Sequence, residues 1–322
     1  MALHRLTRIV LGVPNPQQTA DYYTDFGLLP VGGGEAAGAD SAAPANGYTF
    51  ATADGGEQLR IVHSPRRRLL HLGVGADDPD DLGRVAASLQ AIGVTVERDQ
   101  NGVRAVDPGT EVTVRVEIAD RYDQSPATPP AYNAPGVDAR TGQRAPGILR
   151  EQPVRPRKLG HVVLGSTDQE LSQKFFQHGV GFKVSDTVPG LAAFLRCSTD
   201  HHNVLVQQAP VAFLHHTSWQ VDDIDEVGRG ATAMLAKDPN RHVWGLGRHH
   251  VGSNFFWYLK DPAGNFSEYY SDLDCIVDDA LWQPGVWEGT RGLYSWGPPP
   301  PPSFLAPEDL AALMTGAHQG GA

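Results

Sequence analysis

Histidine is the residue type whose distribution along this chain points to chemistry. Nine of the thirteen histidines lie between His161 and His250, and several of them are adjacent pairs. An imidazole titrates near neutral pH and is a common metal ligand, so such a cluster can move protons or hold an ion. Clustered histidines are also found as ordinary surface or core residues. The role of these histidines therefore depends on the strands and loops that position them.

Composition narrows the classes of protein to which the chain can belong. Its 322 residues are long enough for two domains, each burying its own core, and 40% hydrophobic with 20% charged residues is typical of globular proteins. The net charge of −11 argues against nucleic acid or anionic membranes as partners and favours a small-molecule ligand. No apolar run approaches the roughly 20 residues of a membrane span. Without a signal-peptide pattern, and with only Cys197 and Cys275, we expect a cytoplasmic protein with free thiols.

The elements that must position the histidines occur twice along the chain. Three pairs of segments match: Leu6–Asn15 with Leu159–Asp168, Leu70–Leu82 with His215–Val227, and Val106–Val114 with Lys260–Glu268. The first pair is a strand that leads into a helix, and the second is a strand that ends in acidic residues opening a helix. The third is a strand, an Asp-Pro-x-Gly turn and another strand.

This repeat divides the chain into four parts. We expect a first module over residues 1–120, a Pro- and Gly-rich connection over 121–157, a second module over 158–275, and a tail over 276–322. The tail holds the run GPPPPP, which should be extended as a spacer or surface strap, and then a short helical stretch over 307–314. Each module is predicted to contain a strand, then a helix, then several strands.

This order of elements resembles the vicinal oxygen chelate superfamily, and within it the two-domain type I extradiol dioxygenases. The resemblance covers residues 5–275 and is strongest over 158–272. It implies an α+β fold of two tandem modules, each made of paired βαβββ units in a curved mixed sheet. It also implies extradiol ring cleavage of a catechol-type aromatic at a mononuclear non-haem Fe(II), with Mn(II) also acceptable. O₂ would be the co-substrate, and the family commonly forms homo-oligomers.

The resemblance assigns the metal ligands to His161, His216 and Glu268. Two imidazoles and one carboxylate on one face of an ion leave the opposite face free for substrate and O₂. His215 precedes His216 in the same strand, so we expect it to point to the opposite face.

The first module provides an internal comparison. Aligning the repeats places Arg8, His71 and Val114 at the positions of the three ligands. Two of the three ligand types are missing there and an arginine would repel a cation, so we expect no metal in the first module.

The same resemblance assigns three residues that contact substrate and oxygen. His202 would act as acid and base, His249 as a donor to the substrate, and Tyr258 as a hydrogen-bond donor near the iron. Each histidine has an adjacent alternative, His201 and His250 respectively.

The hairpin that carries Tyr258 has its own requirement. If it closes with Lys260 opposite Asn265, Tyr258 pairs with Ser267 instead of Glu268. We therefore predict a one-residue bulge after Gly264, which a left-handed glycine permits.

Other functions remain open at this point. A glyoxalase-like isomerase or a 2-oxo-acid dioxygenase shares the superfamily, but a glyoxalase-like site usually draws four ligands from two modules. A binding module that sequesters an aromatic compound needs a pocket and no iron. Trp219, Trp244, Trp257 and the tail from Trp282 to Trp296 could line or cover a pocket large enough for a substituted or polycyclic catechol.

Overall fold

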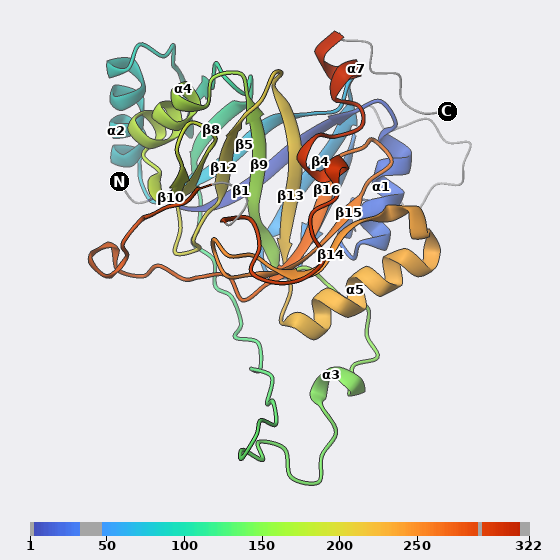
Figure 1. Cartoon of the computed structure of the whole chain (residues 1–322). Coiled ribbons are helices and arrows are strands. Elements are labelled where there is room, and N and C mark those ends of the chain that lie inside the picture. Colours follow the sequence, from blue (N-terminus) through green and yellow to red (C-terminus); the bar gives the residue numbers. More distant parts are fainter. Residues whose placement is uncertain (1–2, 33–46, 289–291, 316–322) are drawn as a thin grey trace.

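Two mixed β-sheets dominate the molecule. The computed structural model describes residues 3–32, 47–288 and 292–315, and Figure 1 shows the two sheets with helices at their sides. At the centre of each sheet two strands run antiparallel, and each of these has a parallel neighbour on its outer side. This arrangement is that of two paired βαβββ units per sheet and confirms the predicted α+β class.

The first sheet has the strand order β2-β3-β4-β1-β5-β8-β7-β6. Its strands are β1 (Leu3–Val13), β2 (Leu29–Val31), β3 (Tyr48–Thr52), β4 (Gly56–His63), β5 (Arg68–Ala76), β6 (Glu97–Arg98), β7 (Gly102–Val106) and β8 (Thr113–Ile118).

The second sheet has the order β14-β15-β16-β13-β9-β12-β11-β10-β17. Its strands are β9 (Lys158–Ser166), β10 (Lys183–Val188), β11 (Ala192–Arg196), β12 (Val204–Gln208), β13 (Phe213–Gln220), β14 (His242–Arg248), β15 (Phe255–Lys260), β16 (Phe266–Ser271) and β17 (Gly285–Val286). The last strand comes from the tail, so the tail extends the sheet of the second module.

The helices are short, and within the described ranges none is long and apolar enough to cross a bilayer. They are α1 (Pro16–Asp25), α2 (Pro79–Ala91), α3 (Pro146–Leu149), α4 (Gln169–Lys174), the π-helical η1 (Phe175–Val180), α5 (Ile224–Lys237), the 3₁₀ turns η2 (Pro239–Arg241) and η3 (Asp279–Leu281), α6 (Pro302–Leu305) and α7 (Leu310–Thr315).

The acidic runs predicted to open helices do so in both modules. The Asp78 carboxylate accepts the backbone N–H of Asp81 at the start of α2, and the Asp223 carboxylate accepts that of Glu226 at the start of α5. Such a cap stabilises a helix by about 1 kcal/mol. Each cap fixes where the chain leaves a central strand and turns back along the sheet.

The two modules share one hydrophobic core, contrary to the expectation of separate cores. The largest buried cluster takes residues from both sheets. Helix α1 of the first module packs on the second sheet: the Phe26 ring stacks on that of Tyr269 with centroids 3.8 Å apart, and the Tyr22 hydroxyl bonds to the Ser267 hydroxyl at 2.7 Å. On the other side, α2 lies against η1. These contacts hold the second sheet from outside its own module.

The connection between the modules projects from the body as a long loop that carries α3 (Figure 1). It is fastened near its end, where the Arg150 guanidinium donates to both carboxylate oxygens of Asp223 at 2.9 and 2.6 Å. Several large apolar side chains of the loop are exposed, among them Tyr132, Val137 and Ile148.

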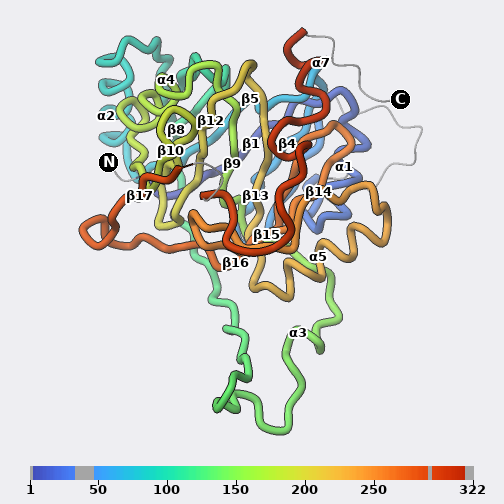
Figure 2. Tube along the Cα trace, viewed as in Figure 1, coloured from blue at the N-terminus to red at the C-terminus, as the bar shows by residue number. Residues whose placement is uncertain are grey.

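The tail crosses the second sheet and continues to α7, as the red tube in Figure 2 shows. The Trp244 indole N–H donates to the Pro298 carbonyl at 2.7 Å, and the Arg248 N–H donates to the Trp296 carbonyl at 2.9 Å. The Pro run therefore follows β14, in agreement with a surface strap. Beyond it, α6 brings Phe304 into the protein, where the ring is buried.

Candidate metal centre

Three adjacent strands at the centre of the second sheet carry the predicted metal ligands. Ser218 on β13 pairs with His161 on β9 on one side and with Glu268 on β16 on the other. The three side chains therefore stand at one level and on one face of the sheet. His216 lies two residues before Ser218 and shares that face. The strand register brings together residues that are far apart in the sequence.

The donor atoms of these residues converge on one point. Nε2 of His161 lies 3.1 Å from Oε2 of Glu268 and 3.4 Å from Nε2 of His216. The remaining distance, from His216 Nε2 to Glu268 Oε2, is 3.7 Å. Ligand atoms about 2.1 Å from one ion and at right angles to each other are about 3 Å apart. The three residues thus fit around a single divalent ion.

The charge of the site also fits a cation. Glu268 is fully buried, and its ion-pair partners among the described residues are all histidines: His161, His216 and His249. Burial acts to raise the pKa of Glu268, but hydrogen bonds from His161 and His249 hold that pKa well below its usual range. Burial and the neighbouring His215 keep the pKa of His216 well below its usual value. An ionised carboxylate and a neutral imidazole are the forms that bind metals.

Two further side chains fix the carboxylate. The Ser218 hydroxyl donates to Oε2 of Glu268, and the Asn254 amide donates to Oε1 at 3.1 Å. Ser218 could have been found from the period of two along β13, because it lies two residues after His216. Asn254 has no comparable signal in the sequence, since it reaches the carboxylate from a loop.

A small pocket of about 80 Å³ adjoins the donor atoms. Its lining combines the functional candidates with apolar walls and contains no lysine or arginine. The lining residues are His161, Val163, Phe194, His202, Leu205, Gln207, His215, His216, His249, Val251, Tyr258, Gly292, Leu293 and Phe304. No tryptophan is among them, so the suggestion that tryptophans line the pocket is wrong, whereas Gly292 and Leu293 of the tail do line it. Trp219 lies in the core and Trp244 stacks beneath Tyr258.

His202 reaches the pocket from the loop before β12. Its ring lies 4.1 Å from that of His161, centroid to centroid. The loop is tied to β9 because the Asn203 amide donates to the Gly160 carbonyl at 3.0 Å, while Asn203 Oδ1 accepts the N–H of Cys197 at 2.8 Å. Burial, followed by the nearby His161 and His201, lowers the pKa of His202 well below its usual value.

His249 and Tyr258 face each other across the pocket. Nε2 of His249 lies 2.8 Å from the Tyr258 hydroxyl, and Tyr258 pairs with Glu268 on the neighbouring strand. Burial and the Glu268 charge raise the pKa of Tyr258, so the phenol keeps its proton.

The predicted irregularity after Gly264 lies in the turn. Lys260 pairs with Phe266 and Tyr258 pairs with Glu268, because Gly264 and Asn265 together lie opposite Asp261, so the predicted one-residue bulge is confirmed. Gly264 has a positive φ of 92°, its N–H bonds to the Asp261 carbonyl, and the Asp261 N–H bonds to that of Asn265. This five-residue turn absorbs the extra residue.

The adjacent alternatives lie outside the pocket lining. His201 sits behind His202, against Asp186 and Trp282. His250 packs on Trp287.

The expectation that His215 faces away from the pocket is wrong. It lines the pocket beside His216, and the two Nδ1 atoms are 2.8 Å apart. The reason is a bulge: on β9, Val163 pairs with His216 and the next residue pairs with Leu214, which leaves His215 without a partner. Strand alternation does not hold across such a residue.

The first module requires one correction to the alignment. His71 pairs with Val10 as His216 pairs with Val163. The predicted correspondence of Arg8 with His161 and of His71 with His216 is therefore confirmed. On the last strand, however, the residue at the level of Glu268 is Arg115, because it pairs with Gly73 as Glu268 pairs with Ser218. The turn between Val106 and Thr113 is one residue longer than its counterpart between Lys260 and Phe266, which shifts Val114 to the other face.

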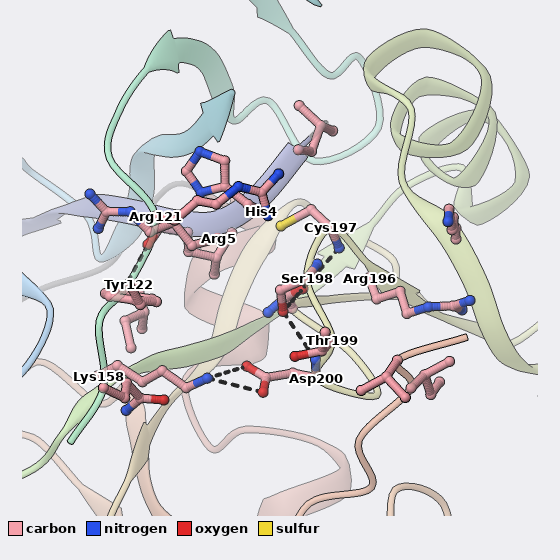
Figure 3. A pocket seen from close by; sticks show the side chains of 18 of the residues that line it. His4, Arg5, Arg121, Tyr122, Lys158, Arg196, Cys197, Ser198, Thr199 and Asp200 are labelled. Atoms are coloured by element: carbon pink, nitrogen blue, oxygen red, sulfur yellow. Dashed lines mark hydrogen bonds and ion pairs between the residues drawn. The ribbon is translucent and has the colours of Figure 1, made fainter. Parts of the chain in front are cut away.

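A larger cavity, about 570 Å³, lies elsewhere, between the two modules (Figure 3). Its charged side chains pair with one another or with neighbours: Lys158 with Asp200 at 2.8 Å, and Arg121 with Asp77 at 2.6 Å. It shares no lining residue with the pocket at the metal ligands. Size therefore does not identify the chemical centre here.

Comparison with known proteins agrees with this geometry. Residues 158–269 match the model of the Glyoxalase/Bleomycin resistance protein/Dioxygenase superfamily. Metapyrocatechase 2 of Cupriavidus necator is 34% identical over 256 residues, which are 76% of this chain and 77% of that protein. The manganese-dependent 2,3-dihydroxybiphenyl 1,2-dioxygenase of Geobacillus genomosp. 3 is 24% identical over 74% of this chain and 79% of its own.

Among solved structures, the Mn(II)-bound glyoxalase from Novosphingobium aromaticivorans superposes with a TM-score of 0.73 at 25% identity, over 93% of both chains. The fold similarity thus extends through both modules.

Proposed function

This chain belongs to the Glyoxalase/Bleomycin resistance protein/Dioxygenase superfamily and is an extradiol dioxygenase, and on that premise we propose that it opens a catechol-type ring at an ion held by His161, His216 and Glu268. The observation that carries the proposal is the convergence of two imidazole nitrogens and one carboxylate oxygen within 3.7 Å of one another. The same residues form the metal-ligand group found in the described part of the chain.

The cofactor is Fe(II) in this proposal, with Mn(II) as the alternative that the ligand set also accepts. A divalent ion held by these residues would supply a Lewis acid for the catechol hydroxyls and a path for electrons from the diol to O₂. The protein supplies three ligands from one side, which leaves the pocket side free for the diol. Ser218 and Asn254 keep the carboxylate in place by hydrogen bonds to its two oxygens.

His202 is the proposed acid and base. Its pKa lies well below the usual value because the ring is buried, so at neutral pH the ring is free to accept a proton from a catechol hydroxyl. Its position beside His161 supports this role, since a diol bound at the ion would lie next to both rings.

Tyr258 and His249 are proposed to stabilise charge on the oxygenated substrate. They lie within hydrogen-bond reach of one another, and Tyr258 stands directly opposite Glu268. With the Nδ1 hydrogen of His249 on the Leu293 carbonyl, Nε2 of the neutral ring accepts the Tyr258 hydroxyl and orients it. A donor that is already oriented before charge develops needs no reorganisation during the reaction.

The substrate in this proposal is an uncharged, single-ring catechol. A pocket of about 80 Å³ with apolar walls leaves little room for a second ring. A carboxylate substituent would be buried without a cationic partner, which costs several kcal/mol. Catechols with a small alkyl substituent therefore fit best.

We further propose that the chain forms a homo-oligomer. The exposed apolar side chains of the projecting connection, Tyr132, Val137, Ile148 and Leu149, support this. Light scattering coupled to gel filtration measures the mass, and a monomer at micromolar concentration would contradict the proposal.

The decisive experiment loads the full chain with Fe(II) or Mn(II) without oxygen and then adds O₂ with one of four compounds. These are catechol, 3-methylcatechol, 2,3-dihydroxybiphenyl and 3,4-dihydroxyphenylacetate. We expect a yellow ring-fission product from the first two, formed with one O₂ consumed per ring. A glyoxalase substrate, the adduct of methylglyoxal with glutathione, is the control. Conversion of that adduct without any ring cleavage would favour the isomerase instead.

A further inference from the structure

Two of the adjacent histidine pairs make the same unusual contact. Nδ1 of His201 lies 3.1 Å from Nδ1 of His202, and Nδ1 of His215 lies 2.8 Å from Nδ1 of His216. Neighbouring side chains of a regular strand point to opposite faces, so they cannot meet in this way. The first pair lies in a loop and the second at the bulge in β13, where the alternation is interrupted.

Such a contact restricts where the hydrogens are. A neutral imidazole carries one N–H and one bare nitrogen. Two facing Nδ1 atoms form a hydrogen bond only if one ring donates and the other accepts. In each pair, the group that contacts Nε2 of the first ring determines which of the two rings donates the hydrogen bond between the Nδ1 atoms.

For the pair at the metal ligand, that partner is a carbonyl. Nε2 of His215 lies 2.7 Å from the backbone oxygen of Phe304, and an oxygen of this kind only accepts. Nε2 of His215 therefore carries the hydrogen and its Nδ1 is bare. His216 must donate from Nδ1, which leaves its Nε2 bare and directed at His161 and Glu268.

For the other pair, the partner is a carboxylate. Nε2 of His201 is buried, has no hydrogen bond to another described residue, and lies 3.4 Å from Oδ2 of Asp186. Asp186 is itself fixed by the tail, since the Gly285 N–H and the Trp287 indole N–H donate to its two oxygens at 2.6 and 3.0 Å. The same order follows: His201 carries its hydrogen on Nε2, and His202 donates from Nδ1.

We propose that His201 and His215 are positioning residues, each of which holds its neighbour as the Nδ1–H tautomer so that the bare Nε2 of His202 and of His216 faces the pocket. For His216 this is the nitrogen that binds the ion. For His202 it is the nitrogen that accepts the substrate proton, and this part rests on the proposed function. The acceptor beyond His215 is the Phe304 carbonyl, to which it is hydrogen-bonded, and the acceptor beyond His201 is the Asp186 carboxylate, 3.4 Å from its Nε2.

The third adjacent pair provides a matched control. His250 is also adjacent to a functional candidate, although it follows His249 where His201 and His215 precede their neighbours, and its ring packs against Trp287 with centroids 4.6 Å apart. His249 instead has its Nδ1 2.6 Å from the Leu293 carbonyl. Replacing His250 should therefore leave the neighbouring tautomer unchanged.

The direct test is the tautomer of each ring, measured by two-bond hydrogen–nitrogen correlation NMR on the metal-free, ¹⁵N-histidine-labelled full chain. We expect Nδ1–H for His202 and His216, and Nε2–H for His201 and His215. A signal showing Nε2–H for His202 or His216 would overturn the proposal. Because no substrate or iron is needed, this result is independent of whether the chain cleaves catechols.

The second test separates the two pairs by function. His201→Phe should lower kcat about 10- to 100-fold with KM and iron content little changed, whereas His215→Phe should weaken metal binding by a similar factor. His201→Asn offers an acceptor near the old Nδ1 position and should restore most of the loss, while His250→Phe should change neither quantity. A His201→Phe enzyme with wild-type kcat, or an Asn variant as slow as the Phe variant, would contradict the positioning role.

Asp186→Asn provides a variant that keeps the shape of the site. Its amide can donate to Nε2 of His201, which reverses the pair and moves the hydrogen of His202 to Nε2. We expect this reversal in the NMR spectrum together with a loss of kcat. Trp287→Phe removes a tail contact to the same carboxylate without touching His201 and should leave the tautomers in place. If the His202 tautomer were unchanged in a folded Asp186→Asn variant, Asp186 would not determine the position of the hydrogen on His201.

Discussion

Apart from β17, the two modules have the same strand order, but they differ at two of the three predicted ligand positions. In the second module His161, His216 and Glu268 converge, whereas the first module has Arg8, His71 and Arg115 at the same levels of its sheet. The bulge beside His216 also has a counterpart, because Leu70 is skipped between His71 and Leu69. The backbone that shapes a metal site is therefore present twice, and the side chains decide which copy can use it.

In the first module arginine side chains stand where the second module has two of its proposed ligands. Arg8 and Arg115 both lie near Oε2 of Glu117, at 3.5 and 3.6 Å. Burial, followed by the charges of Arg104, Arg8 and a further arginine, lowers the pKa of His71. The Arg8 side chain is 56% exposed, whereas that of Glu268 is fully buried. An exposed arginine site is thus stable without metal, whereas the buried carboxylate of the second module benefits from a cation.

The largest effect should come from removing the only charged ligand. Glu268→Gln should lower turnover by about 10³-fold, because the ion contributes several kcal/mol to catalysis. Metal analysis of the purified variant should show loss of iron. Arg115→Gln, at the same level of the first sheet, is the matched control and should keep both metal and activity. If the Glu268→Gln variant kept its iron and its activity, the proposed metal site would be wrong.

The next effect concerns proton transfer without loss of metal. His202→Phe should lower kcat by about 10²- to 10⁴-fold while the iron content stays at the wild-type level. His71→Phe in the first module should have no effect on turnover. The ratio of iron to protein, measured beside kcat, checks that the loss is chemical, and full activity of the His202 variant would end its role.

A smaller effect concerns the equivalent turns of the two modules. Burial raises the pKa of Asp261 to about 6 despite its hydrogen bonds to Asn265, and it also raises that of Asp107. A carboxyl with a raised folded-state pKa stabilises the protein below its unfolded pKa, near pH 4, and this contribution disappears as the pH rises towards 6. Relative to Asp261→Asn, the wild type should lose about 3 kcal/mol of unfolding free energy between pH 4 and 7. Urea denaturation at several pH values measures this, and parallel curves for the two proteins would contradict it.

The smallest effect would convert one module towards the other. Arg8→His with Arg115→Glu, together with the existing His71, recreates the ligand set on the first sheet. We expect weak binding of an additional Zn(II) per chain, because the site is more exposed and lacks a covering tail. Calorimetric titration of the double variant against Arg8→His alone measures it. Identical stoichiometry for the two variants would show that more than the three side chains separates the modules.

The strand register explains how much of the site the sequence could predict. His161, His216 and Glu268 could be assigned from the resemblance to the family, because each lies in a segment that matches it. His215 was placed on the wrong face because alternation assumes a regular strand, and the bulge in β13 lacks the glycine that indicated the bulge at Gly264. Val114 was matched in place of Arg115 because a turn one residue longer moves every later side chain to the opposite face.

The contributions of the tail could not be predicted. Leu293 and Phe304 act through backbone oxygens, and a carbonyl group is present at every residue. Likewise, the contact of Asp186 with His201 depends on a fold that brings β10 behind the loop before β12. Long-range hydrogen bonds to the main chain are invisible in the sequence because they do not depend on residue type.

These backbone contacts separate two properties of the pocket. The hydrogen bonds from His215 and His249 end on main-chain oxygens, whereas the side chains of the same two residues, Phe304 and Leu293, form part of the pocket wall. Exchanging those side chains for larger or smaller ones would reshape the wall and leave the acceptors where they are. Relatives and engineered variants could therefore diverge in the ring substituents they admit by altering these positions, while the histidines keep their orientation.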